Sequence, residues 1–112
     1  MYKLGTVVLI PFPFTDLSST KLRPAVIISK NNEINEDIIV AFISSKISNS
    51  LCSILITKDS VEFVSSGLKK ESEIRLNKIA TLNKSLILGE LGYLSKNFLN
   101  KHRKNFYNIF GF

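Results

Sequence analysis

The segment from Phe12 to Ser29 carries the side chains with the clearest chemical potential in this sequence. A stretch rich in hydroxyl groups ends there at Arg23, and Pro24 follows directly. Because proline restricts the residue before it to extended backbone, we expect Arg23 to sit rigidly at the mouth of a strand. A guanidinium held in this way can bind a phosphate through two parallel hydrogen bonds. The pattern alone equally allows a surface salt bridge at the same position.

The usual catalytic constellations are missing from the sequence. It contains no Gly-rich phosphate loop, no HExxH and no CxxC, and its Asp and Glu residues follow no metal-ligand spacing. The only histidine, His102, falls on the apolar side of a predicted helix, which favours a packing role over a general base. Cys52 has no histidine near it in sequence and is interpreted as a small buried hydrophobe. We therefore predict a site without metal or cofactor.

Composition indicates one globular domain over residues 1–112 with a polyanionic partner. The hydrophobic fraction is 45% and the charged fraction 21%, as in ordinary folded proteins. Fifteen Lys and Arg residues against nine Asp and Glu give a net charge of +6, which favours nucleic acid, an anionic membrane or an acidic protein as partner. The single cysteine, the lack of a signal peptide and the lack of any membrane-spanning apolar run predict a cytoplasmic protein that does not enter membranes.

Hydrophobic patterning predicts a mainly β protein with one C-terminal helix. Alternating and β-branched runs predict strands at 6–10, 24–29, 37–43, 53–57 and 73–82, and a further strand that contains Gly89 and Gly92. Pro11 is expected to end the first strand, and a short helical excursion is expected to end at Gly67. From an N-cap at Ser95, apolar residues then follow helical spacing to Phe110. A small β-barrel with a covering helix accommodates these elements.

Two blocks near the N-terminus resemble the opening of MazF/PemK-type toxins. These blocks are 5–16, which begins Gly-Thr-Val-Val-Leu-Ile-Pro-Phe, and 21–29, which reads Lys-Leu-Arg-Pro-Ala-Val-Ile-Ile-Ser. The segments 40–46 and 73–82 are similar to later strands of that family, and the C-terminal helix lies where the family has one. The resemblance spans essentially the whole chain, in order and with compatible spacing.

The resemblance implies both a fold and an activity. The fold is an SH3-like (CcdB/PemK-type) barrel, usually a homodimer. The activity is that of the toxin in a type II toxin–antitoxin system, a metal-independent and sequence-selective endoribonuclease that cleaves single-stranded mRNA and is blocked by its cognate antitoxin. Because RNA supplies its own nucleophile in the 2′-hydroxyl, such an enzyme would leave a 2′,3′-cyclic phosphate and a 5′-hydroxyl.

The family's functional residues carry over to particular positions. The arginine before proline corresponds to Arg23 and the hydroxyl at the end of the third strand to Ser44, and these two are the predicted catalytic residues. The predicted substrate-binding residues are Phe12, Phe14, Thr15, Lys21, Lys46, Arg75 and Asn77. Phe12 and Phe14 could stack on bases or pack in the core. Asn77 stands where some members have an acid and Ala80 where some have an arginine, so no residue is assigned as the general base.

A non-enzymatic reading stays open beside the nuclease. CcdB-like toxins share the fold and poison DNA gyrase by binding it, typically through a C-terminal segment that contains Trp, whereas this chain has no Trp and ends Ile109-Phe110-Gly111-Phe112. A catalytically decayed family member is the other alternative. Incubation of the purified protein with mixed RNA in EDTA separates these readings.

Overall fold

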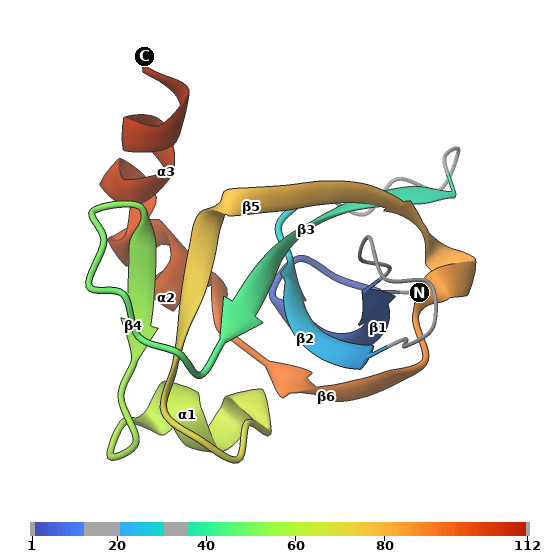
Figure 1. Ribbon diagram of the computed structural model, residues 1–112, viewed down its shortest axis with the longest axis horizontal. Coiled ribbons are helices and arrows are strands. Elements are labelled where there is room, and N and C mark those ends of the chain that lie inside the picture. The colour runs from blue at the N-terminus through green and yellow to red at the C-terminus, as the bar shows by residue number, and fades with distance from the viewer. Residues whose placement is uncertain (1, 13–20, 31–35, 112) are drawn as a thin grey trace.

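The computed structural model describes residues 2–12, 21–30 and 36–111, and the statements below concern those residues. The strands are β1 (Thr6–Phe12), β2 (Lys21–Ile27), β3 (Asp37–Ser44), β4 (Ser53–Ile56), β5 (Ser72–Asn83) and β6 (Gly89–Tyr93). The helices are α1 (Val61–Ser66), the 3₁₀ turn η1 (Lys84–Leu86), α2 (Lys96–Lys101) and α3 (Arg103–Phe110). The strands form one curled antiparallel sheet in the order β4–β5–β3–β2–β1–β6 (Figure 1). None of the described helices has the length and apolarity needed to span a bilayer.

Both faces of the central strands are buried. One apolar cluster, here called the helix-side cluster, includes Ala41 and Ile74 of the sheet together with Phe98 and Leu99 of α2. The other, here called the far-side cluster, consists of the alternate residues of the same strands: Val8, Ile10, Ala25, Ile27, Ile38 and Val40. Because side chains alternate along a strand, burial of both faces explains why β1, β2 and β3 read as nearly continuous apolar runs.

A change of register divides the pairing of β3 with the long strand β5. Ala41 pairs with Ile79, but the next residue, Phe42, pairs with Arg75. Three residues of β5, Leu76 to Lys78, therefore have no partner on β3, and β5 bends along its length (Figure 1). Beyond the shift, Ser44 pairs with Glu73, so polar residues of β5 lie beside the end of β3.

The ends of the first two strands differ from the prediction. β1 continues through Pro11, and its last residue, Phe12, pairs with Lys21. β2 accordingly begins at Lys21, before Pro24 and not with it. The pairing of β2 with β3 begins only at Ala25, so the part of β2 that contains Pro24 and Arg23 is bonded on one side. Proline is tolerated at such an edge, because a ladder donor is not needed there.

The C-terminal helical region consists of two helices where one was predicted. Ser95 does cap the first, since its Oγ accepts the Phe98 N–H at 3.1 Å, as expected. This helix then ends at His102, whose backbone angles of φ −104° and ψ 22° are not helical. Phe98 and Leu99 are buried, but no residue of α3 is fully buried. The sequence period remains helical across the break, which is why the pattern did not reveal it.

The predicted helical excursion is the helix α1, and Gly67 ends it as expected. Gly67 adopts a left-handed conformation with φ 75°, and its N–H returns to the Val64 carbonyl. A Cβ at Gly67 would lie 2.0 Å from the carbonyl oxygen of Leu91 on β6. This glycine therefore allows both the turn and the close approach of α1 to the sheet, from which the chain continues into residues 68–72.

We predict that Gly67→Ala destabilises the fold much more than Gly111→Ala. Both glycines have φ above +70°, but a Cβ at Gly111 would meet nothing within 4 Å. Gly111→Ala should therefore cost only the conformational penalty of about 1–2 kcal/mol, whereas Gly67→Ala adds a backbone clash and should cost about 2–4 kcal/mol in all. Urea unfolding of both variants measures the difference, and equal losses would show that α1 moves away from β6 at little cost.

Candidate functional site

An open pocket of ≈ 320 Å³ lies between the ends of β2 and β3 and the segment 68–72, which leads into β5 and includes its first residue. Arg23 and Ser44 both line it. Ala25 pairs with Phe42 across these strands, and Arg23 and Ser44 each lie two residues further along, so their side chains leave the same face of the sheet. They extend the rows of the far-side cluster toward solvent, and both side chains are half-buried. We call this space the Arg23 pocket.

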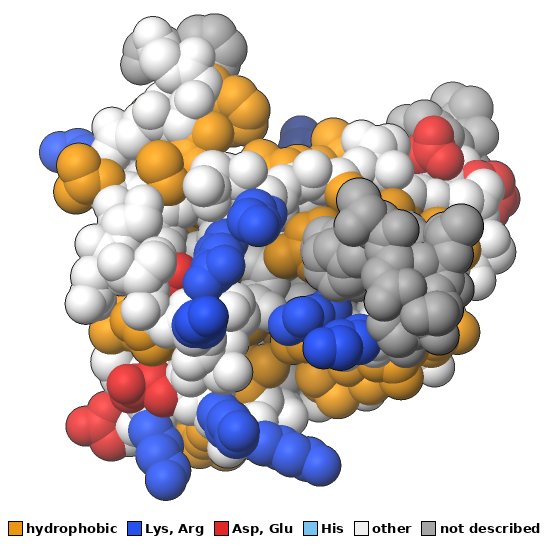
Figure 2. Space-filling view, in the orientation of Figure 1, with side chains coloured by type: hydrophobic (Ala, Val, Ile, Leu, Met, Phe, Trp, Pro, Cys, Tyr) orange, Lys and Arg blue, Asp and Glu red, His pale blue; other side chains and the backbone are white. Residues whose placement is uncertain are grey.

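The Arg23 pocket is strongly basic. Lys21 of β2 and two lysines of the preceding segment, Lys69 and Lys70, line it together with Arg23, and the described lining includes no Asp or Glu. Figure 2 shows Lys and Arg side chains gathered across this face of the molecule. Four cations around an open, partly apolar hollow favour a polyanion such as a nucleic-acid backbone.

The hydroxyl of Ser44 is oriented by the backbone that follows it. Its Oγ accepts the N–H of Lys46 at 3.1 Å, a local turn that closes directly after β3. Because the oxygen already accepts this bond, the hydroxyl proton is available to donate to a ligand oxygen. Ser44 is therefore placed as a hydrogen-bond donor in the Arg23 pocket.

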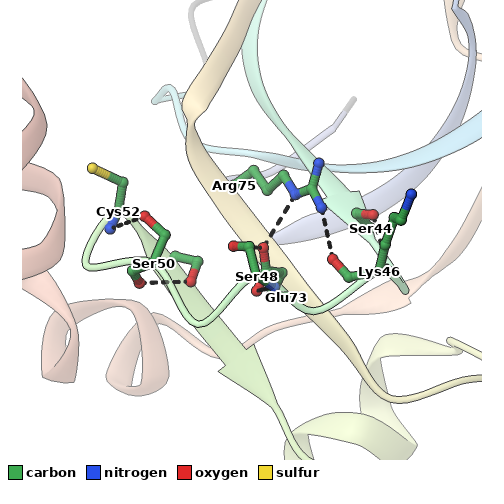
Figure 3. A network of polar contacts seen from close by, with 8 residues as sticks. Ser44, Lys46, Ser48, Ser50, Cys52, Glu73 and Arg75 are labelled. Carbon is green, nitrogen blue, oxygen red and sulfur yellow. Dashed lines mark hydrogen bonds and ion pairs between the residues drawn. The ribbon is translucent and has the colours of Figure 1, made fainter.

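A second, polar pocket of ≈ 230 Å³ lies beside β5 toward β4, and we call it the Arg75 pocket. It is lined by Ser48, Ser50, Ser53, Glu73, Arg75, Asn77 and Lys78. Its centre is an ion pair in which Nε of Arg75 donates to Oε2 of Glu73 at 3.1 Å (Figure 3). The same carboxylate accepts the Ser48 N–H at 2.9 Å and the Ser48 hydroxyl at 2.6 Å.

Glu73 is ionised and enclosed in this arrangement. Its side chain is only 1% exposed, against 24% for that of Arg75. Burial alone raises the pKa of Glu73, but the hydrogen bonds from Ser48 and Arg75, with the positive charge of Arg75, outweigh burial and lower the pKa below its ordinary value of 4.5. A carboxylate so occupied stabilises its neighbours and is poorly suited to accept a proton from substrate.

The structure separates the sequence-predicted site residues into two groups. Arg23, Ser44 and Lys21 share the Arg23 pocket, while Arg75 and Asn77 line the Arg75 pocket. Lys46 lies between the groups, and its carbonyl accepts Nη2 of Arg75 at 2.6 Å (Figure 3). Phe14 and Thr15 lie outside the described residues, as does the side chain of Phe12 at the end of β1.

Sequence reasoning missed several residues of this region, among them Ser48, Lys69, Lys70 and Glu73. Glu73 is one of the acids that follow no metal-ligand spacing in the sequence, and its role depends on Arg75, two residues later on the same face of β5. A Glu-x-Arg spacing on a strand was the available signal. Nothing in the pattern placed the lysine pair of the α1–β5 connection beside β2.

His102 and Cys52, the other two side chains weighed in the sequence analysis, line neither pocket. His102 is half-buried and meets the Phe98 ring edge-on at 4.8 Å, a packing position. Burial and the nearby charge of Lys101 lower the pKa of His102, against a smaller opposing effect of Glu62. Cys52, expected to be buried, is half-buried in the turn before β4, because the polar connection of residues 45–52 runs along the surface. The described residues contain no group of three His, Cys, Asp or Glu side chains that could hold a metal ion.

The fold and the pockets define a small β-sheet protein with an arginine-centred, basic binding face. The chain belongs to the PemK-like, MazF-like toxins of type II toxin–antitoxin systems, whose family model matches residues 3–110. A comparison with curated proteins found no match.

Several solved structures have the same fold. One is an endoribonuclease in complex with its cognate antitoxin from Mycobacterial species, with a TM-score of 0.76, 18% identity, and coverage of 99% of this chain and 96% of that one. Another is a MazE–MazF complex from Deinococcus radiodurans, with a TM-score of 0.75, 14% identity, and coverage of 98% and 96%. The Mycobacterium tuberculosis toxin MazF-mt6 has a TM-score of 0.73, 15% identity, and coverage of 95% and 96%.

We predict that Glu73→Gln weakens the acid dependence of stability. The lowered folded-state pKa means that ionised Glu73 stabilises the fold above pH 4.5, and that this contribution disappears as the pH falls through the folded-state pKa. At neutral pH the variant should lose about 1–3 kcal/mol, because an amide cannot accept from all three donors. Urea unfolding between about pH 7 and about pH 3 should show the two proteins converging in acid, whereas parallel curves would contradict the assignment.

Proposed function

We propose that this toxin is a metal-independent, sequence-selective endoribonuclease that cleaves single-stranded mRNA. The observation that carries the proposal is the Arg23 pocket, where Arg23 and Ser44 leave one face of adjacent strands in an open hollow lined by three further cations. Such a site offers fixed positive charge and a hydroxyl donor to one phosphodiester, with room for the chain on either side.

The proposed chemistry needs alignment and charge stabilisation. The 2′-oxygen attacks the adjacent phosphorus, its proton passes to solvent, and the 5′-oxygen leaves and takes up a proton, which gives a 2′,3′-cyclic phosphate and a 5′-hydroxyl. Arg23 stabilises the charge that develops on the phosphoryl oxygens, and because a guanidinium holds its protons its role is electrostatic. Ser44 donates to a phosphoryl oxygen or to the 2′-oxygen.

The Arg75 pocket would hold the flanking part of the RNA. Arg75, Asn77 and Lys46 border it or lie beside it, and Lys21 stands at the other end of the basic face. Phe12, Phe14 and Thr15 remain predicted substrate contacts. Asn77 is exposed but cannot serve as a base, because an amide has no basic nitrogen.

Further properties follow from family membership and are part of the proposal. We propose that the chain is a single SH3-like (CcdB/PemK-type) domain over residues 1–112, that it works in the cytoplasm, and that an acidic cognate antitoxin blocks its basic face. Solved structures of the fold include a complex described as an endoribonuclease with its cognate antitoxin, which supports the last point.

We expect the protein to be a homodimer in solution. A two-fold interface would extend the basic face into a longer groove for RNA, and the C-terminal helix offers apolar surface for it, since Tyr107 and Phe110 are 51% and 53% exposed. Sedimentation at micromolar concentration should give twice the 12.6 kDa mass of the chain. A monomer under these conditions would contradict the dimer.

We predict that the protein cleaves mixed RNA in EDTA and that Arg23→Ala slows the chemical step more than it weakens binding. Loss of one preorganised donor to a transition state costs on the order of a hundredfold or more in rate. Arg23→Lys should not restore the rate, because a point charge cannot replace a planar fork. Single-turnover cleavage, on an RNA chosen by sequencing fragment 5′ ends, measures the rate.

Two variants serve as comparisons in the same assay. Ser44→Ala should lose less than Arg23→Ala if the hydroxyl aligns the substrate, and Cys52→Ser, at a residue that lines neither pocket, should cleave at the wild-type rate. Circular dichroism checks the fold of each variant. Wild-type cleavage by folded Arg23→Ala would place the chemistry elsewhere, and inactivity of the wild-type protein toward all RNA would favour a non-enzymatic, gyrase-binding or decayed toxin.

A further inference from the structure

A buried carboxylate in the middle of a basic binding face requires an explanation. Glu73 is 1% exposed and accepts three hydrogen bonds, two from Ser48 and one from Arg75. Its oxygens thus face protein donors, and the solvent-accessible part of the pair belongs to Arg75. A group enclosed in this way cannot touch RNA, so any effect on RNA must pass through its partners.

The partners of Glu73 connect the two pockets. Arg75 donates from Nε to Glu73 and from Nη2 to the carbonyl of Lys46, whose own N–H donates to the hydroxyl of Ser44 (Figure 3). Ser48, held by Glu73 at both its N–H and its hydroxyl, fixes the far end of the same short segment. One carboxylate therefore anchors residues 44–48 to β5, between the Arg23 pocket and the Arg75 pocket.

The two bonds of Arg75 also fix the direction of its guanidinium. With Nε and Nη2 engaged, Figure 3 shows the third nitrogen directed away from Glu73. A guanidinium has five N–H groups in a rigid plane, so fixing two of them fixes the orientation of the others. Arg75 can thereby meet a phosphate at a set angle with little further loss of side-chain entropy.

We propose that Glu73 is a positioning residue of the RNA site, which orients the Arg75 guanidinium and the 44–48 segment so that both pockets hold one RNA strand. The inference rests on the proposed function. It assigns Glu73 no proton transfer and no contact with substrate, and it explains why a basic face retains a buried acid.

A double-mutant cycle on RNA affinity tests the proposal. The probe is a single-stranded RNA of randomised sequence with 2′-fluoro in place of every 2′-hydroxyl, which lacks the nucleophile and cannot be cleaved. We expect Glu73→Gln and Arg75→Ala each to weaken binding about fivefold to tenfold, and the double variant to bind within about twofold of either single variant, because both changes remove the same contact. If the two losses of RNA affinity multiply in the double variant, the proposal is wrong.

Two further measurements keep the test independent of the folding of Glu73→Gln. Arg75→Lys keeps the charge but cannot bond Glu73 and the Lys46 carbonyl as a planar fork, so we expect it to bind RNA as weakly as Arg75→Ala. Restoration of wild-type affinity by lysine would show that orientation is unimportant. In ¹⁵N NMR spectra the Arg75 Nε–H should be protected from exchange in the wild-type protein, and the absence of protection would remove the anchor itself.

The matched control is Glu71→Gln. Glu71 lies two residues before Glu73 and is exposed, and its carboxylate accepts the backbone N–H of Lys58 at 2.9 Å. It changes the local charge equally and should leave RNA affinity and the Arg75 signal unchanged. If wild-type protein cleaves RNA but the cycle is additive, only the role of Glu73 fails. If wild-type protein neither binds nor cleaves RNA, the proposed function fails.

Discussion

The change of register between β3 and β5 is the constraint on which the binding face depends. Had the pairing of Ala41 with Ile79 continued unchanged, Ser44 would face the buried Leu76. The three unpaired residues of β5 bring Glu73 opposite Ser44 and Arg75 opposite Phe42 instead. Leu76 remains in the core, and its N–H donates to the Cys52 carbonyl at 2.9 Å, so the bend leaves this donor satisfied. The register shift thus lets one strand contribute Leu76 to the core and Glu73 and Arg75 to the Arg75 pocket.

The register shift places the carboxylate of Glu73 in a buried position, and the residues around it offset the cost of burying that charge. An isolated carboxylate is costly to bury, and the cost is offset only by close opposite charge and satisfied lone pairs. Arg75 supplies the charge and Ser48 supplies two donors. The folded state therefore requires the surface segment around Ser48 to stay against β5. This connection of eight residues, 45–52, is held little by apolar packing, since Ile47 and Leu51 are exposed.

The sequence was most informative where a local pattern decides the structure. Ser95 and Gly67 indicated helix ends, and alternating or β-branched apolar runs indicated the strands, because caps and strand faces depend on neighbours in the chain. The Arg-Pro pair indicated the position of Arg23 for the same reason. The break at His102, the register shift and the position of the Lys69–Lys70 pair beside β2 depend on packing between distant segments, which no local pattern records. Glu73 was predictable only in part, since the sequence shows its spacing from Arg75 but not its burial.

The two arginines are held by different means, and the difference fits different tasks. Arg23 is fixed by its backbone, because Pro24 and the pairing of Ile10 with Arg23 leave the strand little freedom. Arg75 is fixed through its side chain, by an acid and a carbonyl that occupy two of its donor nitrogens. Under the proposed function, a position set by the backbone suits Arg23 to meeting the charge that develops on the phosphoryl oxygens. The Arg75 guanidinium, with Nε and Nη2 already engaged, would hold a flanking phosphate at a constant angle, which suits it to binding the RNA strand.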